Sequence, residues 1–225
     1  MSTSPHYLWL ARCAAALALA GNLAVTLTAC APIVVGGAMI GTGLFVSDRR
    51  TSGAQIEDQS IEFKAANRVS NLATLGQVSV TSYNGNLLVT GQVPGANEKA
   101  QVEKAVAGVE HVRAVFNEIE VGPNASMSTR SNDTFLSGKI KATLVDAKDL
   151  QSNAYKVVVE RGVAYLMGRV TEREATRGAD VARSVSGIHK VVRVFEIISE
   201  EDLARLGTAP AVAAPAAPAP AASAP

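Results

Sequence analysis

The sequence predicts an α+β fold made of two tandem αββαβ units, each a small three-stranded mixed sheet with two helices packed on it. Three observations lead to this prediction. A pattern of glycines and valines occurs twice, each copy contains two β-rich runs joined by a turn dipeptide, and helical patterns precede and follow each pair of runs. A chain of 225 residues has room for both units.

The repeat is visible as a constant spacing between matching residues. Three positions of the first copy recur 77 residues later: Gly85, Gly91 and Val93 correspond to Gly162, Gly168 and Val170. A further set recurs 79 residues later: Gly108, Val112 and Phe116 correspond to Gly187, Val191 and Phe195. The second copy has therefore gained two residues between the sets. Matching of this kind indicates duplication of one structural unit.

The elements of the two copies are expected in the same order. A first helix is expected over 57–73 and 132–146, and a hairpin turns at Asn84-Gly85 and Arg161-Gly162. The second helix is expected over 97–107 and, in copy two, from a capping box that opens at Thr171. The expected face of that helix is Ala175, Ala179, Ala182 and Val185, and Gly187 ends it. The last strands are expected over 112–121 and 191–198.

Composition excludes several classes of protein. The chain has 21 Lys and Arg against 20 Asp and Glu, so it lacks the basic surplus of a nucleic-acid-binding protein. Two cysteines exclude a disulfide-rich scaffold. Cys and His are not clustered at metal-ligand spacing, and no Ser, His and Asp set suggests a nucleophile. We therefore expect no metal, no cofactor, no small-molecule substrate and no catalytic residues.

The N-terminus has the pattern of a bacterial lipoprotein signal. Residues 13–28 are apolar and end at Leu27-Thr-Ala-Cys30, which resembles a lipobox. Cleavage before Cys30 would leave a residue that carries acyl chains on its sulfur and its amine. The alternative is an ordinary cysteine in a transmembrane anchor. Ala31 follows where an Asp would suggest retention in the inner membrane, so we expect an anchor in the outer membrane that faces the periplasm.

The expected organisation follows from these patterns. It comprises a signal peptide over 1–29, a lipidated Gly-rich tether over 30–56, a first domain over 57–122, a linker over 123–130, a second domain over 131–199 and an Ala/Pro-rich disordered tail over 200–225. Within the tail, residues 200–206 could extend as a short helical turn before the Ala/Pro-rich composition begins at Gly207.

The αββαβ unit, with a glycine after its first strand and another near the end of its second, resembles the BON domain. Two such units behind a lipobox resemble the dual-BON outer-membrane lipoproteins, from Cys30 to about Ile198. The segments that begin at Asp48, Ser131 and Leu166 carry the resemblance most closely. It implies a protein without catalysis that binds anionic phospholipid through the first helix of its second domain. It also implies concentration at division sites and support of outer-membrane integrity.

A helical wheel of residues 134–147 separates two apolar stripes. The core stripe is Leu136, Ile140, Thr143, Leu144 and Ala147. A second stripe lies on another side and is flanked by two lysines. Together they form the predicted phospholipid-binding set: Phe135, Gly138, Lys139, Lys141, Ala142 and Val145. Apolar side chains beside ammonium groups suit insertion at the headgroup level of an anionic membrane. The alternative is that the second stripe packs against the first domain.

Charge differs between the two copies. Residues 131–198 hold 11 basic and 8 acidic residues, a net charge of +3, whereas residues 57–121 hold 5 and 8, a net charge of −3. An anionic surface would attract the second copy. We therefore expect a lipid-anchored protein whose partner is an anionic phospholipid membrane. The alternative function is a periplasmic adaptor that binds envelope or division proteins in outer-membrane assembly or cell-wall machinery.

Overall fold

The computed structural model describes residues 48–70, 72 and 76–208. The predicted signal peptide, Cys30 and most of the tether lie outside the described residues, as does the tail beyond 208. Within the described ranges, no helix has both the length and the apolar character needed to cross a membrane.

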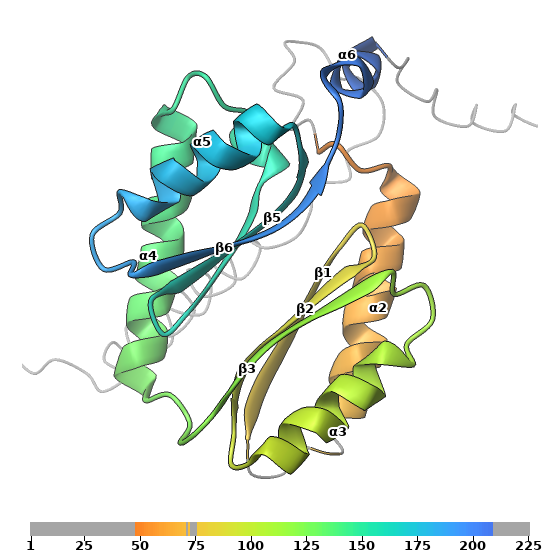
Figure 1. Cartoon of the computed structure of the whole chain (residues 1–225), viewed down its shortest axis with the longest axis vertical. Helices are drawn as coiled ribbons and strands as arrows, with labels where there is room; N and C mark the ends of the chain where they lie inside the picture. Colours follow the sequence, from red (N-terminus) through yellow and green to blue (C-terminus); the bar gives the residue numbers. More distant parts are fainter. Residues whose placement is uncertain (1–47, 71, 73–75, 209–225) are drawn as a thin grey trace, which may run out of the picture. The chain divides into compact units, whose positions relative to one another are not determined.

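The element order is αββαβ twice (Figure 1). The first domain contains α2 (Ser52–Ser70), β1 (Gln77–Tyr83), β2 (Asn86–Val93), α3 (Ala96–Ala107) and β3 (Ala114–Val121). The second contains α4 (Met127–Asp146), a 3-10 turn (Ser152–Ala154), β4 (Lys156–Glu160), β5 (Val163–Val170), α5 (Glu172–Arg183) and β6 (Lys190–Ile197). A final helix, α6 (Glu200–Thr208), follows the second domain. The predicted α+β class is confirmed.

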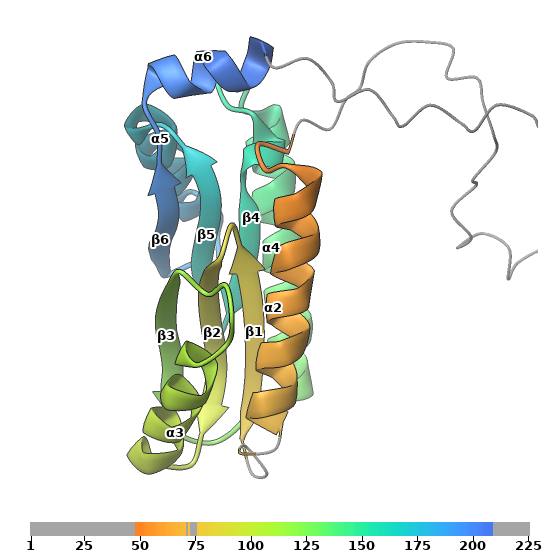
Figure 2. The same ribbon diagram turned by 90° about the vertical axis from the view of Figure 1, so that its right-hand side faces the viewer.

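Both sheets are mixed and share one topology. The strand orders are β1-β2-β3 and β4-β5-β6, with the first pair antiparallel and the second pair parallel in each sheet. The parallel pairs need a crossover, which α3 and α5 provide. The two helices of each domain lie on the same side of its sheet (Figures 1 and 2). The strand orders make β1 and β4 edge strands, and each lies beside the first helix of its domain.

Each domain has its own apolar core between helices and sheet. In the first helices the buried residues recur every four positions, which places them on one face. The first core includes Ile61, Ala65, Val69, Leu87, Val89, Val93, Val102 and Val106. The second includes Leu136, Ile140, Leu144, Leu166, Val170, Ala175, Ala179 and Ala182. The predicted alanine face of α5 is thus buried on its sheet, as expected from the spacing.

A third buried cluster joins the two domains. Side chains alternate along a strand, so the residues between the core positions of β2 and β5 point away from the helices. Those residues form one cluster with neighbours from both sheets: Tyr83, Leu88, Val163, Tyr165, Met167 and Val194. The sheet face that no helix covers in one domain therefore packs on the corresponding face of the other.

The first helix of each domain begins earlier than predicted. Helix α2 begins at Ser52 rather than 57, because the Thr51 hydroxyl accepts a hydrogen bond from the Ala54 amide at 3.1 Å. Helix α4 begins at Met127 rather than 132, because Ser126 caps it by accepting from the Thr129 amide at 3.1 Å. The expected linker over 123–130 is correspondingly shorter, and the tether over 30–56 ends inside α2.

The first nine residues of the tail form α6, which is longer than the short helical turn considered for 200–206 and is not disordered. The Ser199 hydroxyl accepts from the Asp202 amide at 3.0 Å, and Glu200, Glu201 and Asp202 lie in the first turn. Carboxylates near a helix N-terminus interact favourably with the helix dipole. Local capping therefore starts a helix before the Ala/Pro-rich composition takes over.

Candidate membrane-binding helix

A buried carboxylate fixes α4 to its sheet. Asp133 is 5% exposed and accepts hydrogen bonds from the backbone amides of Arg161 at 2.8 Å and Gly162 at 2.9 Å. These two residues form the β4–β5 turn in the left-handed region, with φ of +48° and +74°. A carboxylate in the second turn of α4 thus holds the tip of the neighbouring hairpin, which sets the rotation of the helix about its axis.

The first domain contains an equivalent buried carboxylate, which accepts hydrogen bonds from more donors. Asp58 of α2 accepts from the amides of Asn84 at 2.7 Å and Gly85 at 2.8 Å, and from the Ser82 hydroxyl at 2.6 Å. Arg50 also donates to it at 2.7 Å. Burial alone would raise the pKa of Asp58, but these donors hold its pKa below the ordinary value.

The rotation set by Asp133 turns one stripe of α4 outward. Phe135 is 64% exposed and Val145 is 66% exposed, and Gly138 and Ala142 between them are also exposed. This stripe lies opposite Leu136, Ile140 and Leu144, which are buried in the core. The alternative that the first domain covers the stripe does not agree with these exposures. The predicted apolar surface is therefore free on the described part of the chain.

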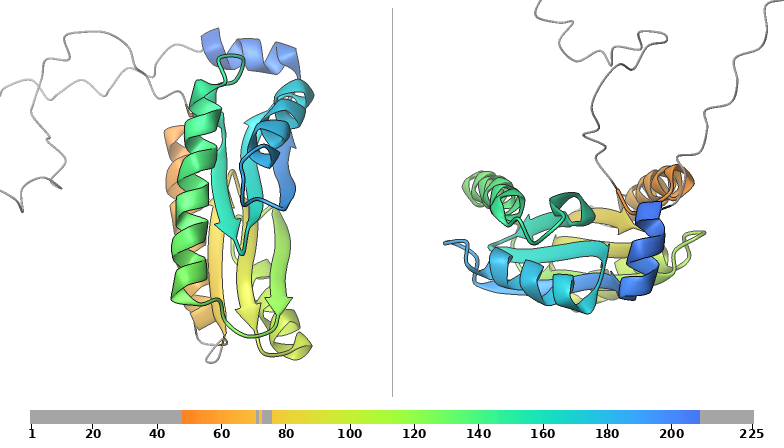
Figure 3. Two further views of the ribbon diagram at one scale, coloured as in Figure 1. Left: turned by 90° about the vertical axis from the view of Figure 1, so that its left-hand side faces the viewer. Right: turned by 90° about the horizontal axis from the view of Figure 1, so that it is seen from above.

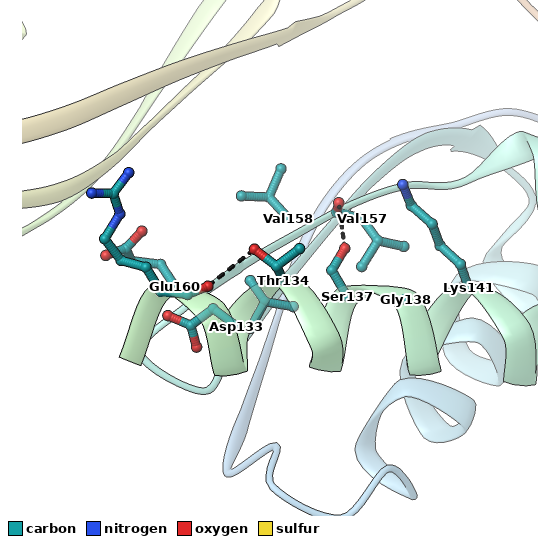
Figure 4. Close-up of a pocket in the computed structure, with 10 residues that line it drawn as sticks. Asp133, Thr134, Ser137, Gly138, Lys141, Val157, Val158 and Glu160 are labelled. Atoms are coloured by element: carbon teal, nitrogen blue, oxygen red, sulfur yellow. Dashed lines mark hydrogen bonds between the residues drawn. The ribbon is translucent and has the colours of Figure 1, made fainter. Parts of the chain in front are cut away.

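Basic side chains lie on both sides of the stripe. The Lys139 ammonium lies 5.6 Å from the centroid of the Phe135 ring, within range of a cation–π contact. Lys141 lies on the opposite flank, at the rim of a groove of about 440 Å³ (Figure 4). The groove lies between α4 and the edge strand β4, which run side by side (Figure 3). All six predicted residues thus lie on one surface of α4, and their role in lipid binding stays a prediction.

The groove beside Lys141 is lined by small and polar residues of the helix and mainly by valines of the strand. Thr134, Ser137 and Gly138 line the helix side, and Val157 to Glu160 line the strand side (Figure 4). The Ser137 hydroxyl donates to the Val157 carbonyl at 3.4 Å, so one outward-facing carbonyl of the edge strand has a partner.

Two residues of this surface were missed by the sequence prediction. Met127 is 72% exposed at the start of α4, and Arg130 lies in the next turn at the rim of the groove. Both fall in the segment that was expected to be a linker. The signal that could have revealed them is Ser126, a favourable N-cap residue with an apolar residue directly after it.

Helix α2 also exposes apolar side chains. Ile56 and Phe63 are 68% and 70% exposed and lie seven residues apart, on one face of the helix. The residues around that face are uncharged, and the nearby Lys64 pairs with Glu110 at 2.9 Å. Helices α2 and α4 therefore both expose an aromatic ring, and they differ in that only the ring of α4 has lysines beside it that are available to an anionic surface.

Comparison with known families identifies the repeated unit. The model of the BON domain matches residues 57–123 and 132–199, which correspond to the two αββαβ domains. The chain belongs to the BON-domain family. Its two BON domains account for every strand in the described part of the chain.

Two similar proteins match this chain over most of its length. Outer membrane lipoprotein DolP of Haemophilus influenzae is 35% identical over 185 residues, which cover 81% of this chain and 95% of that protein. A 21 kDa hemolysin of Actinobacillus pleuropneumoniae is 30% identical, with 67% of this chain and 79% of that protein covered. The chain is therefore a dual BON-domain protein of the DolP type, as the resemblance predicted.

Solved structures add little to this assignment. CdsD, a structural protein of the Type III secretion system of Chlamydia trachomatis, is 12% identical, with 64% of this chain and 97% of that chain covered. The TM-score is 0.27, too low to support an argument about fold or function.

Proposed function

We propose that this protein is a lipid-anchored protein of the outer membrane that makes a second contact with anionic phospholipid through α4 of its second BON domain. The similarity to an outer membrane lipoprotein of Haemophilus influenzae supports the location, and the lipobox at Cys30 supports the anchor. The two contacts with the membrane would support outer-membrane integrity, including at division sites, by binding and without catalysis.

The observation that carries this proposal is the outward stripe of α4. With 64% of the Phe135 side chain exposed, its insertion at the headgroup level would remove about 130 Å² from water, worth about 3 kcal/mol. Lys139 and Lys141 would each add about 1 kcal/mol near an anionic surface. The contact is therefore weak alone, and it becomes effective when a tether on the same membrane raises the local concentration.

The matched helices provide the test. A fragment of residues 48–208 removes the tether, so vesicle sedimentation reports the contact of the folded domains alone. Phe135→Glu should lower binding to phosphatidylglycerol-containing vesicles at least tenfold, since it removes apolar contact and adds a repelled charge. Phe63→Glu makes the same change on an equally exposed ring of α2 and should leave binding unchanged.

Two results would contradict the proposal. One is undiminished binding of a folded Phe135→Glu fragment. The other is an equal loss in the Phe63→Glu fragment, which would mean that any exposed aromatic ring is enough. Circular dichroism of both variants shows whether the fold is kept.

A second candidate function, an adaptor for envelope proteins, is favoured by the uncharged apolar face of α2. Ile56 and Phe63 lie on the domain with net charge −3, where an anionic membrane is repelled. If Phe63→Glu impairs the envelope in cells while vesicle binding stays normal, this second function gains support.

A further inference from the structure

The short segment before α2 is buried more deeply than its place at the end of a tether requires. Arg49 is 6% exposed, and its guanidinium donates to both carboxylate oxygens of Glu174, at 2.7 and 2.8 Å. Glu174 lies in α5, 125 residues further along the chain. Further hydrogen bonds to the two charged groups are needed to offset the cost of removing such an ion pair from solvent.

The second domain supplies partners for both terminal nitrogens of the Arg49 guanidinium, whereas its Nε is buried without one. Arg49 also donates to the Arg169 carbonyl at 2.9 Å and to the Gln151 side chain at 3.1 Å, and the Arg169 guanidinium donates back to the Arg49 carbonyl at 3.1 Å. Glu174 accepts from the Thr171 amide at 3.0 Å and so also closes the capping box of α5. Burial opposes both charges, but the pairing lowers the pKa of Glu174 and raises the pKa of Arg49.

The next residue enters the other domain. Arg50 donates to Asp58 at 2.7 Å, which is the carboxylate that holds the β1–β2 turn. Its guanidinium also lies 4.1 Å from the centroid of the Tyr83 ring and pairs with Asp48 at 2.7 Å. Two consecutive arginines therefore bind two different domains through buried carboxylates.

The same segment lies beside the candidate membrane-binding helix. Asp48 lines a cavity of about 280 Å³ together with Lys141 and Val145, near the C-terminal end of α4. Only residues 31–47 separate Asp48 from Cys30, and 17 residues cannot reach beyond about 60 Å. The place where the chain joins the domains therefore decides which surface stays close to an anchored Cys30.

We propose that Arg49 and Arg50 form a clasp that fixes the root of the tether to both BON domains, and that Arg49 is the positioning residue that keeps this root beside the C-terminal end of α4. The part of this proposal that concerns α4 rests on the proposed function, because the position of the tether root matters only if α4 contacts lipid. With the clasp closed, α4 is presented to the bilayer that holds the anchor. With Arg49 released, the second domain loses its direct attachment to the root.

The test uses the full-length lipoprotein in nanodiscs and a nitroxide on Ser47→Cys. The lipoprotein without this substitution serves as the background, since Cys13 would leave with the signal peptide and the sulfur of Cys30 would be acylated. In the parent protein the nitroxide should attenuate the amide signals of residues 141–146 in an NMR spectrum. Arg49→Gln should remove at least half of that attenuation, because the root is no longer held at α5.

A matched control and a second variant keep the test decisive. Arg177→Gln breaks an ion pair of 2.8 Å with Asp149 that is about half exposed and lies within the second domain, so the attenuation should persist. Glu174→Gln removes the charge that faces Arg49 but keeps an oxygen for the cap, and it replaces Arg49→Gln if that variant does not fold. Full attenuation in the folded variant would overturn the clasp.

A second readout separates failure of the clasp from failure of the proposed function. Hydrogen exchange of α4 is measured in anionic vesicles for the parent, Arg49→Gln and Phe135→Glu proteins. If Phe135→Glu leaves the exchange unchanged while Arg49→Gln abolishes the attenuation, the lipid contact is wrong and the clasp stands. If both variants raise the exchange of α4 and Arg177→Gln does not, both proposals are supported.

Discussion

The buried carboxylate of α4 leads to a quantitative prediction about stability. Asp133→Asn keeps the size of the side chain but replaces two accepting oxygens with one, so its NH₂ group would face a backbone N–H. In the parent protein the two bonds measure 2.8 and 2.9 Å, and the group is 5% exposed. A hydrogen bond to a charged group contributes about 1.5–3 kcal/mol, and a buried unsatisfied donor costs about 1–3 kcal/mol. We expect a loss of about 2–4 kcal/mol.

The first domain provides a graded comparison. Asp58→Asn removes charge from a group that accepts from Ser82, Asn84, Gly85 and Arg50. It also weakens the pairing with Arg50, which keeps Asp48 as its other partner, so the added cost is about 1.5–3 kcal/mol. Asp146→Asn, on the exposed end of α4, should change stability by no more than about 0.5 kcal/mol.

The assay is urea unfolding of the 48–208 fragment, followed by far-UV circular dichroism. The expected order of destabilisation is Asp58→Asn, then Asp133→Asn, then Asp146→Asn. If Asp133→Asn moves the urea midpoint no further than Asp146→Asn, the carboxylate does not hold the hairpin. The reasoning would also be refuted if Asp58→Asn proved no more costly than Asp133→Asn, since the number of donors would then not determine the effect.

Two further predictions concern the strands and the ion pair. Gly91→Ala should lower stability by more than about 2 kcal/mol, because φ is +120° and a Cβ there would overlap the Gln77 carbonyl; an unchanged melting temperature would contradict this. Pairing with Arg49 lowers the pKa of Glu174 below 4.5 in the folded protein, so the unfolded state binds the proton more readily. The stability that ionised Glu174 contributes is therefore present above pH 4.5 and is lost as the pH falls below that value. Urea midpoints at pH 7, 5, 4 and 3 should show this decline, and Glu174→Gln should flatten it.

Much of the fold could be predicted because the two copies carry local signals of its elements. The Asn84-Gly85 and Arg161-Gly162 turns lie between β-rich runs, and the structure has a hairpin at each. The capping box at Thr171 is present, with both of its hydrogen bonds. Helix starts were less accurate because a single serine or threonine hydroxyl decides them, and such residues are common in loops.

The candidate site could be predicted in part for the same reason. Helical periodicity is local, so the outward stripe of α4 followed from residue spacing once the core stripe was assigned. Met127 was missed because it lies before the predicted start of the helix. The clasp could not be predicted, since nothing in the spacing of Arg49 and Glu174 shows that residues 125 positions apart form an ion pair.

The buried contact between the two sheets has a consequence for how the repeat can be divided. Tyr83 and Leu88 in one copy pack against Tyr165 and Met167 in the other, in one buried cluster formed by both sheets. A single copy expressed by itself would expose this apolar surface to solvent and should dimerise or aggregate. The two copies therefore depend on each other for solubility, and we expect them to occur together in one chain rather than as separate domains.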